Sequence, residues 1–125
     1  MTKMADISEA ATFRNQLDAL SIKFVADFKR RDAKACAEAY TDDALLMLPG
    51  AAPIRGRIEI AAGFQAAFDA GRVVERLTTT RAESDGNIGY AVQTVHGKGE
   101  DGTVMLALRC DEDGIWLVCC EAVIA

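Results

Sequence analysis

The chain has 125 residues, half of them hydrophobic, and a formal net charge of −5 at pH 7. That length suits one domain over residues 1–125 with a real core and is too short for two ordinary domains. Acidic and basic residues are mixed along the chain, which disfavours nucleic acid and anionic membrane as partners, because both require a concentrated basic face. No stretch reaches the roughly 18 uninterrupted apolar residues of a membrane helix. Residues 1–6 lack the apolar core of a signal peptide, so we expect a soluble cytoplasmic protein.

The cysteines agree with a reducing compartment. Cys36, Cys110, Cys119 and Cys120 show no C-x-x-C spacing, and each falls in a predicted helix or strand. We interpret them as small buried hydrophobic residues. With a single histidine, His96, and no ligand-type spacing, we expect no metal site and no cofactor.

Helical periodicity dominates the first half of the chain. Apolar residues recur at steps of three and four and predict a helix over 8–31, a short helix over 33–40 capped by Asp32, and a third helix over 57–70. The steps of the first helix are Phe13, Leu17, Leu20, Phe24 and Phe28. The basic run at 29–31 either complements the carbonyl end of the first helix or forms a phosphate site.

Strand-like periodicity dominates the second half. We predict strands over 73–84, 88–96, 103–110 and 115–124, after a short apolar strand over 44–48. Asp85-Gly86 and Asp113-Gly114 are hairpin turn signals, and residues 97–102 form a glycine-rich loop. Helices followed by a four-strand meander indicate the α+β class.

The last two strands are apolar on both faces, as in residues 104–108. An antiparallel sheet with one wet face alternates apolar and polar residues instead. One face covers the helices, and too few helices remain to cover the other. We therefore predict a homodimer packed through the outer sheet face; the alternative is a flat face shielded by loops.

A set of short motifs resembles a known superfamily. YTDDA at 40–44, PG at 49–50, IRGR at 54–57 and IAA at 60–62 are similar to the nuclear transport factor 2-like superfamily, in its SnoaL-like and ketosteroid isomerase-like branch. The resemblance covers nearly the whole chain. It implies a cystatin-like cone, in which three N-terminal helices pack on a strongly curved, mostly antiparallel sheet. It also implies a deep pocket at the wide end and dimerisation through the sheet.

The residues that steroid isomerisation requires are absent at the positions that the resemblance matches. Those enzymes use a carboxylate base, a tyrosine with a supporting tyrosine, and a protonated aspartic acid. Leu48 stands at the base position, Phe24 and Phe64 at the tyrosine positions, and Leu106 at the acid position. None of these four side chains can donate or accept a proton, so we do not expect steroid isomerase activity.

Glu121 is the first candidate catalytic residue, and His96 is the second. Glu121 is the only charged residue in the apolar run 115–125, and hairpin register places it opposite Leu106, on the implied cavity face. Alternatively, Glu121 forms an ion pair with Arg81 or Arg109, or lies at an exposed strand end. His96 is either an acid, a base or a hydrogen-bond donor, or an exposed residue at a strand end.

We interpret most of the remaining candidates as residues of an apolar pocket wall, and the polar ones among them lie mainly on one strand. Tyr40 either offers its hydroxyl to the pocket or closes the packing of helix on strand. The predicted lining is Phe24, Phe28, Tyr40, Met47, Leu48, Phe64, Tyr90, Val92, Thr94, Leu106, Leu108, Cys119 and Val123.

Three functions fit this pattern. The first is a non-catalytic module that binds a small apolar ligand, which the missing isomerase residues favour. The second is a lyase, isomerase or cyclase that acts on a small apolar carbonyl compound, with Glu121 as proton carrier. The third is an interaction domain without a ligand, which a filled interior would support.

Overall fold

The computed structural model describes residues 4–124. Its helices are α1 (Met4–Lys29), α2 (Ala33–Ala37) and α3 (Gly56–Asp69). Its strands are β1 (Tyr40–Met47), β2 (Ile54–Arg55), β3 (Arg76–Asp85), β4 (Ile88–His96), β5 (Asp101–Cys110) and β6 (Trp116–Val123). No helix of this part of the chain has the length and apolar character needed to cross a membrane.

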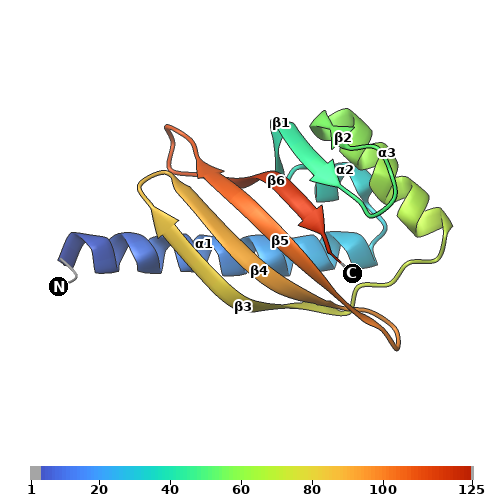
Figure 1. Cartoon of the computed structure of the whole chain (residues 1–125), viewed down its shortest axis with the longest axis horizontal. Helices are drawn as coiled ribbons and strands as arrows, with labels where there is room; N and C mark the ends of the chain where they lie inside the picture. The colour runs from blue at the N-terminus through green and yellow to red at the C-terminus, as the bar shows by residue number, and fades with distance from the viewer. Residues whose placement is uncertain (1–3, 125) are drawn as a thin grey trace.

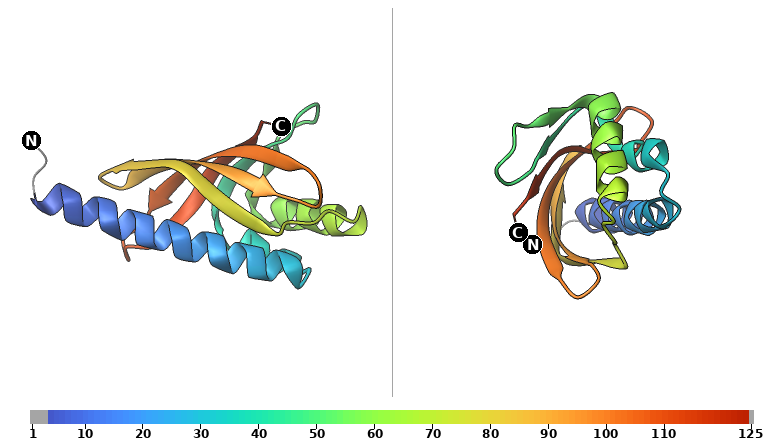
Figure 2. Two further views of the ribbon diagram at one scale, coloured as in Figure 1. Left: turned by 90° about the horizontal axis from the view of Figure 1, so that it is seen from below. Right: turned by 90° about the vertical axis from the view of Figure 1, so that its right-hand side faces the viewer.

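The strands form a single mixed sheet in the order β2-β1-β6-β5-β4-β3. Strands β3 to β6 are the predicted antiparallel meander, whereas β1 pairs with β6 in parallel. The sheet is strongly curved, and α1 runs along its concave side, with α2 and α3 at the end near β1 (Figures 1 and 2). The predicted α+β class and its curved sheet on N-terminal helices are confirmed.

The region between α2 and β1 differs from the prediction. The predicted helix 33–40 ends at Ala37, and β1 begins at Tyr40, four residues before the predicted strand 44–48, and so includes the polar residues Thr41, Asp42 and Asp43. Asp32 caps α2 as predicted, since its carboxylate accepts a hydrogen bond from the Ala35 N–H at 3.0 Å. The Val118 N–H donates to the Ala39 carbonyl at 2.9 Å. Pairing with β6 thus satisfies the backbone here and outweighs local turn preference.

Two clusters of buried side chains lie on the concave side, and the larger one extends from the narrow end to Ala44 of β1 and Ile60 of α3. At the narrow end, Phe13 packs edge-to-face on Trp116 with ring centroids 4.6 Å apart, next to Leu17 and Leu108. At the wide end, a second cluster consists of Phe28, Cys36, Phe68 and Val74. The interior between them is not filled, and this space is the subject of the next subsection.

The basic run at 29–31 has structural contacts. The Arg30 guanidinium pairs with Asp27, a carboxylate that is buried and also accepts from Lys23. The Arg31 guanidinium donates to the Phe68 carbonyl at 2.8 Å and so ties α1 to α3. These contacts favour the structural interpretation of the run over a phosphate site.

Gly89 on β4 is a position where the fold tolerates no side chain. A Cβ there would lie 2.7 Å and 2.8 Å from two ring atoms of Phe13, which is itself buried under the sheet. We expect Gly89→Ala to lower the free energy of unfolding by about 1–3 kcal/mol, the cost of overpacking a core. Urea denaturation followed by circular dichroism measures this change.

Gly63→Ala is the matched control. Gly63 lies in α3, and a Cβ there meets only the mobile δ-methyl group of Ile54, at 3.3 Å. Alanine favours the helix by about 1 kcal/mol relative to glycine, so this variant should be no less stable than the wild type. Equal stability of Gly89→Ala and wild type would contradict the packing described at the narrow end.

Candidate functional site

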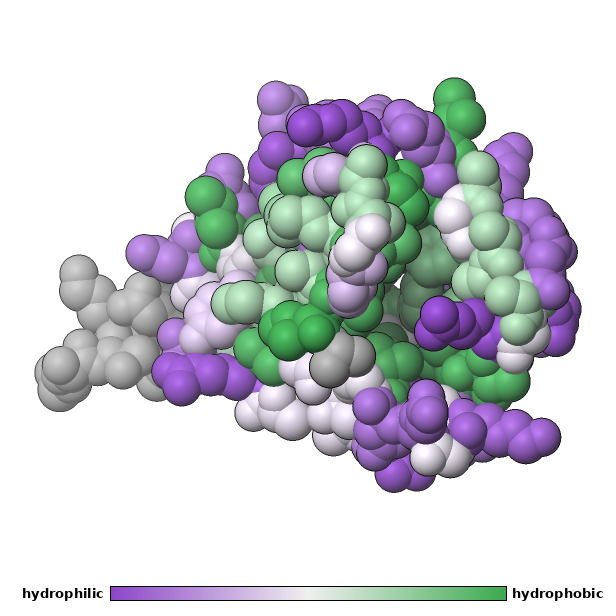
Figure 3. Space-filling model, turned by 45° about the vertical axis from the view of Figure 1, so that its right-hand side comes forward, coloured by the Kyte–Doolittle hydropathy of each residue, from purple (hydrophilic) through white to green (hydrophobic). Residues whose placement is uncertain are grey.

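A cavity of about 1070 Å³ lies between the concave face of the sheet, α1 and α3. Its wall is mostly hydrophobic, and Figure 3 shows a hollow bordered by hydrophobic side chains. Helices α1 and α3 contribute Leu17, Leu20, Phe24, Phe28 and Phe64. The sheet contributes Tyr40, Leu46, Leu77, Val95, Val104, Leu106, Val118, Glu121 and Val123, and Leu48 lies on the loop side. The filled interior that would support the third predicted function, an interaction domain without a ligand, is therefore not observed.

Glu121 is a charged side chain on the sheet side of this wall, as is Asp101 at the start of β5. Glu121 lies on β6 opposite Leu106 of β5 and Leu46 of β1. The Tyr40 hydroxyl donates a hydrogen bond to Glu121 Oε1 at 2.7 Å. Among residues 8–124 only Tyr40 hydrogen-bonds this carboxyl group. Neither carboxyl oxygen is both inaccessible to solvent and without a hydrogen-bond partner. The second oxygen is therefore open to the cavity.

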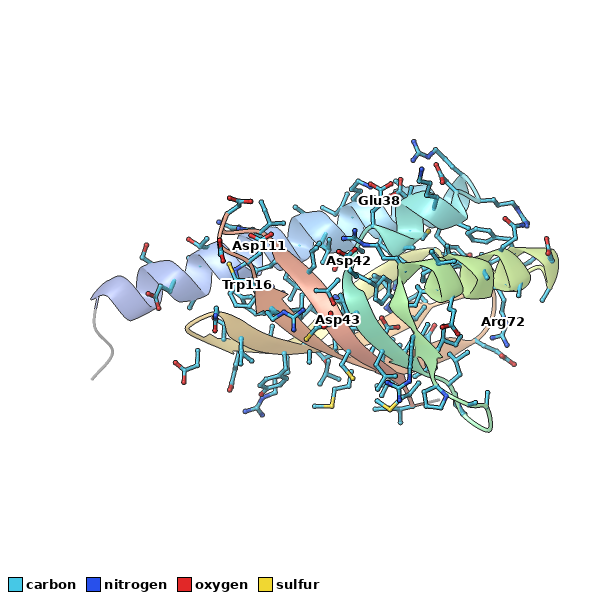
Figure 4. All side chains as sticks on the ribbon, turned by 90° about the horizontal axis from the view of Figure 1, so that it is seen from above. Glu38, Asp42, Asp43, Arg72, Asp111 and Trp116 are labelled. Atoms are coloured by element: carbon cyan, nitrogen blue, oxygen red, sulfur yellow. The ribbon has the colours of Figure 1, made fainter. Side chains whose placement is uncertain are left out.

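The predicted alternative for Glu121, an ion pair with an arginine, is wrong. Arg81 pairs with Glu83 and donates to the Tyr90 hydroxyl on the outer face. Arg109 pairs with Asp43, which projects from β1 (Figure 4). Both arginines thus have partners away from the cavity, and among residues 8–124 no cationic side chain forms an ion pair with Glu121.

Burial dominates the acidity of Glu121. Loss of hydration raises the pKa of its carboxyl group to about 7, even though the Tyr40 hydrogen bond acts in the opposite direction. Burial, and then the neighbouring carboxylate, raise the pKa of the Tyr40 hydroxyl well above its usual value, so this group stays protonated. At neutral pH the pair therefore holds both a hydrogen-bond donor and a carboxyl group that can gain or lose a proton.

The register of β5 and β6 explains why Glu121 faces inward. The loop between them, residues 111–115, is one residue longer than the gap between the predicted strands 103–110 and 115–124, because Cys110 pairs with Trp116. An extra residue in β6, Cys119, forms a bulge between the pairs Leu108–Val118 and Ala107–Cys120. The two irregularities cancel, so Glu121 still lies opposite Leu106. The prediction that Cys119 lines the pocket is wrong, since its Sγ contacts the Ala107 carbonyl instead.

The predicted inner face of β4 is wrong. Tyr90, Val92 and Thr94 do not line the cavity. His96 pairs with Asp101 across a four-residue loop, which places Ala91 opposite Leu106. Residues directly opposite on adjacent strands share a face, so the inner residues of β4 are Ala91, Gln93 and Val95.

His96 lies away from Glu121 for the same reason. Its Nε2 is 2.8 Å from the Thr78 hydroxyl, and its Nδ1 is 3.3 Å from an Asp101 carboxylate oxygen. It does not line the cavity, so it does not act with Glu121.

Two further predicted wall residues lie elsewhere. Met47 points to the outer side of β1, where it is partly exposed, and its neighbour Leu46 faces inward in its place. Leu108 is fully buried in the narrow-end cluster, where Phe13 and Trp116 leave no space. The remaining candidates line the cavity: Phe24, Phe28, Tyr40, Leu48, Phe64, Leu106 and Val123.

The geometry agrees with comparisons to known proteins. The model of the SnoaL-like domain family matches residues 22–118. The chain belongs to the SnoaL-like domain family. No curated protein matches it. Among residues 4–124 of this SnoaL-like chain, no three His, Cys, Asp or Glu side chains are grouped to hold a metal ion.

Solved structures share the fold at low identity. A function-unknown protein from Mycobacterium tuberculosis is 21% identical, with a TM-score of 0.74 over 98% of this chain and 77% of that one. A cystatin-like domain of unknown function from Nostoc punctiforme is 17% identical, with a TM-score of 0.73 over 98% and 78%. A ketosteroid isomerase-like protein from Erwinia carotovora is 21% identical, with a TM-score of 0.65 over 86% and 93%. The predicted superfamily and cystatin-like fold of this SnoaL-like chain are thus confirmed.

The raised pKa of Glu121 predicts a pH dependence of stability. The folded-state pKa of about 7 exceeds the ordinary value of 4.5, so between these values the folded state binds more protons than the unfolded state. Stability contributed by the neutral carboxyl group is full below about pH 4.5 and is lost as pH rises to about 7, by up to about 3 kcal/mol. Glu121→Gln has no such loss.

Chemical denaturation of wild type and variant between pH 5 and 8 tests this. As pH rises, the unfolding free energy of the wild type should fall relative to that of Glu121→Gln. Glu83→Gln, at an exposed site on β3, is the control and should give a difference that stays flat. A flat difference for Glu121→Gln, or a carboxyl pKa near 4.5 by ¹³C NMR, would contradict the desolvated site.

Proposed function

We propose that this SnoaL-like protein binds a small, mostly apolar molecule in the cavity and holds one polar group of it at Glu121. The observation that carries the proposal is a desolvated carboxyl group on an apolar wall, oriented by a single hydrogen bond from Tyr40. A cavity near 1070 Å³ lies just above the usual range of about 300–1,000 Å³ for small-molecule sites.

The chemistry of Glu121 defines the polar group of this ligand. A protonated carboxyl group donates a hydrogen bond to a carbonyl oxygen, and an ionised one accepts from a hydroxyl group. With its pKa at about 7, Glu121 serves either partner at neutral pH. The rest of the ligand contacts aromatic and aliphatic side chains such as Phe24, Phe64 and Leu106, so we expect it to be apolar.

A second candidate function is proton transfer to such a ligand, as in a lyase or isomerase. The pKa of Glu121 favours it, because a general acid or base works best when its pKa lies near the working pH. Steroid isomerisation by the usual groups is not proposed, since Phe24, Leu48, Phe64 and Leu106 occupy those positions. A measured pKa near 4.5 removes this candidate.

Filling the cavity tests the binding proposal. Nile red, an uncharged apolar dye with a carbonyl group, should bind the wild type saturably at one molecule per chain. Leu106→Trp fills the wall at a buried position and should weaken binding at least about tenfold, since it removes apolar area for the ligand to bury. Fluorescence titration measures both affinities.

An exposed residue supplies the control. Ile58 on α3 is 89% exposed and does not line the cavity, so Ile58→Trp should leave the affinity unchanged. Circular dichroism verifies that both variants fold. Equal binding by wild type and a folded Leu106→Trp variant would place the dye outside the cavity and contradict the proposal.

We also propose that the protein is a cytoplasmic homodimer that packs through the convex sheet face. Support comes from the exposed apolar residues Ile88 and Met105 on that face, which no helix of residues 4–124 covers (Figure 2). Met105→Glu would bury a charge in such an interface, at a cost of several kcal/mol, and should yield monomers in light scattering after size exclusion. Ile58→Glu, on α3 and 89% exposed, should remain dimeric. A monomeric wild type at micromolar concentration would overturn the proposal.

A further inference from the structure

Another polar side chain lies on the cavity wall, and the predicted lining did not include it. Gln93 on β4 is only 2% exposed, yet it lines the cavity. Polar side chains are rarely buried without hydrogen bonds, so the partners of this amide show which of its atoms remains free.

The amide nitrogen of Gln93 is fully used. It donates to the Ser21 hydroxyl of α1 at 2.9 Å and to the Thr79 hydroxyl of β3 at 3.1 Å. An amide has two N–H donors and one carbonyl acceptor, so both donors are paired and the plane of the amide is fixed from two sides. Among residues 8–124 no group donates a hydrogen bond to Oε1. In the same part of the chain, every side-chain oxygen or nitrogen that is inaccessible to solvent has a hydrogen-bond partner, so Oε1, which has none, is accessible. Oε1 is therefore an acceptor that is open to the cavity.

Gln93 and Glu121 lie at a defined separation across the sheet. Gln93 is opposite Val104 of β5, and Val104 is opposite Val123 of β6, two residues beyond Glu121. Two strand spacings, about 10 Å, and an offset of two residues along the strand, about 7 Å, separate Gln93 from Glu121, so the two positions are about 12 Å apart. The cavity thus has an acceptor on one side and the Glu121–Tyr40 pair on the other, with apolar wall between them.

We propose that the ligand is an elongated, mostly apolar molecule with two polar ends, whose hydroxyl group at one end donates to Gln93 Oε1 while its other polar end binds Glu121. This inference rests on the proposed function and adds the second recognition point. A ligand that fills the cavity without a donor at this point would leave Oε1 desolvated and unpaired. Such a loss corresponds to roughly tenfold in affinity.

Rigid biphenyl probes test the two-ended site. We would titrate the wild type with biphenyl, 4-hydroxybiphenyl, 4,4′-dihydroxybiphenyl and 4-hydroxy-4′-methoxybiphenyl by calorimetry. The dihydroxy compound should bind about tenfold tighter than the monohydroxy compound. The methoxy compound should gain nothing over the monohydroxy compound, because a methoxy oxygen cannot donate.

Gln93→Met retains the length of the side chain and removes the acceptor. It should abolish the preference for the second hydroxyl group while the monohydroxy affinity changes by less than about twofold. Thr94→Val replaces a polar residue on the outer face of the same strand and should leave every affinity unchanged.

The outcomes separate the two proposals. Binding of none of the four probes, and of no apolar dye, would overturn the proposed function. Binding without a preference for the second hydroxyl group, a preference that survives Gln93→Met, or equal gain from the methoxy group would overturn the Gln93 assignment and leave apolar binding intact.

An NMR measurement on the wild type tests the assignment even if Gln93→Met does not fold. With selective labelling, the side-chain ¹³Cδ resonance of Gln93 should shift on addition of the dihydroxy compound and not on addition of the monohydroxy compound. An unmoved resonance at saturation would also overturn the assignment.

Discussion

The parallel pairing of β1 with β6 is the constraint on which the site depends. It places Tyr40 opposite Val118 and Leu46 opposite Glu121, so the Tyr40 hydroxyl reaches the carboxyl group from the far end of the same strand pair. Without β1, Glu121 would lie at a sheet edge, hydrated and with an ordinary pKa. Closure of the sheet by β1 therefore both forms one wall of the cavity and determines the acidity of its carboxyl group.

An apolar cavity with few polar groups selects ligands through the cost of leaving those groups unpaired. Hydrophobic contacts with Phe24, Phe64 and Leu106 supply affinity, but they discriminate weakly between molecules of similar size. The polar contacts of Glu121 and Gln93 are different, because no donor within the described part of the chain, residues 8–124, replaces water at their free oxygens when a ligand enters. Specificity in such a site follows from how many of these oxygens the ligand satisfies.

Much of the fold was predictable because local signals and the global fold agree. Periodicity identified the long helix from Phe13 to Phe28, and turn residues identified both hairpins. The site was less predictable, and for different reasons on two strands. The Cys119 bulge in β6 leaves no sequence signal. On β4 the information was present, since any loop of even length after His96 pairs Leu106 with an odd-numbered residue. That arithmetic places Gln93 inside, whereas alignment with the resembling family favoured the face of Tyr90, Val92 and Thr94.

The same frame supports different chemistry because the fold and the site depend on different residues. Closure of the cone requires small or apolar residues at positions such as Gly89, Ala91 and Leu106, and none of them reacts. Within the resemblance to ketosteroid isomerases, the positions of the proton-handling groups are apolar here, whereas Glu121 and Tyr40 place a carboxyl–hydroxyl pair on another part of the wall. Similarity of fold therefore indicates where the cavity lies in this protein. The individual polar atoms on the cavity wall determine which ligands it can hold.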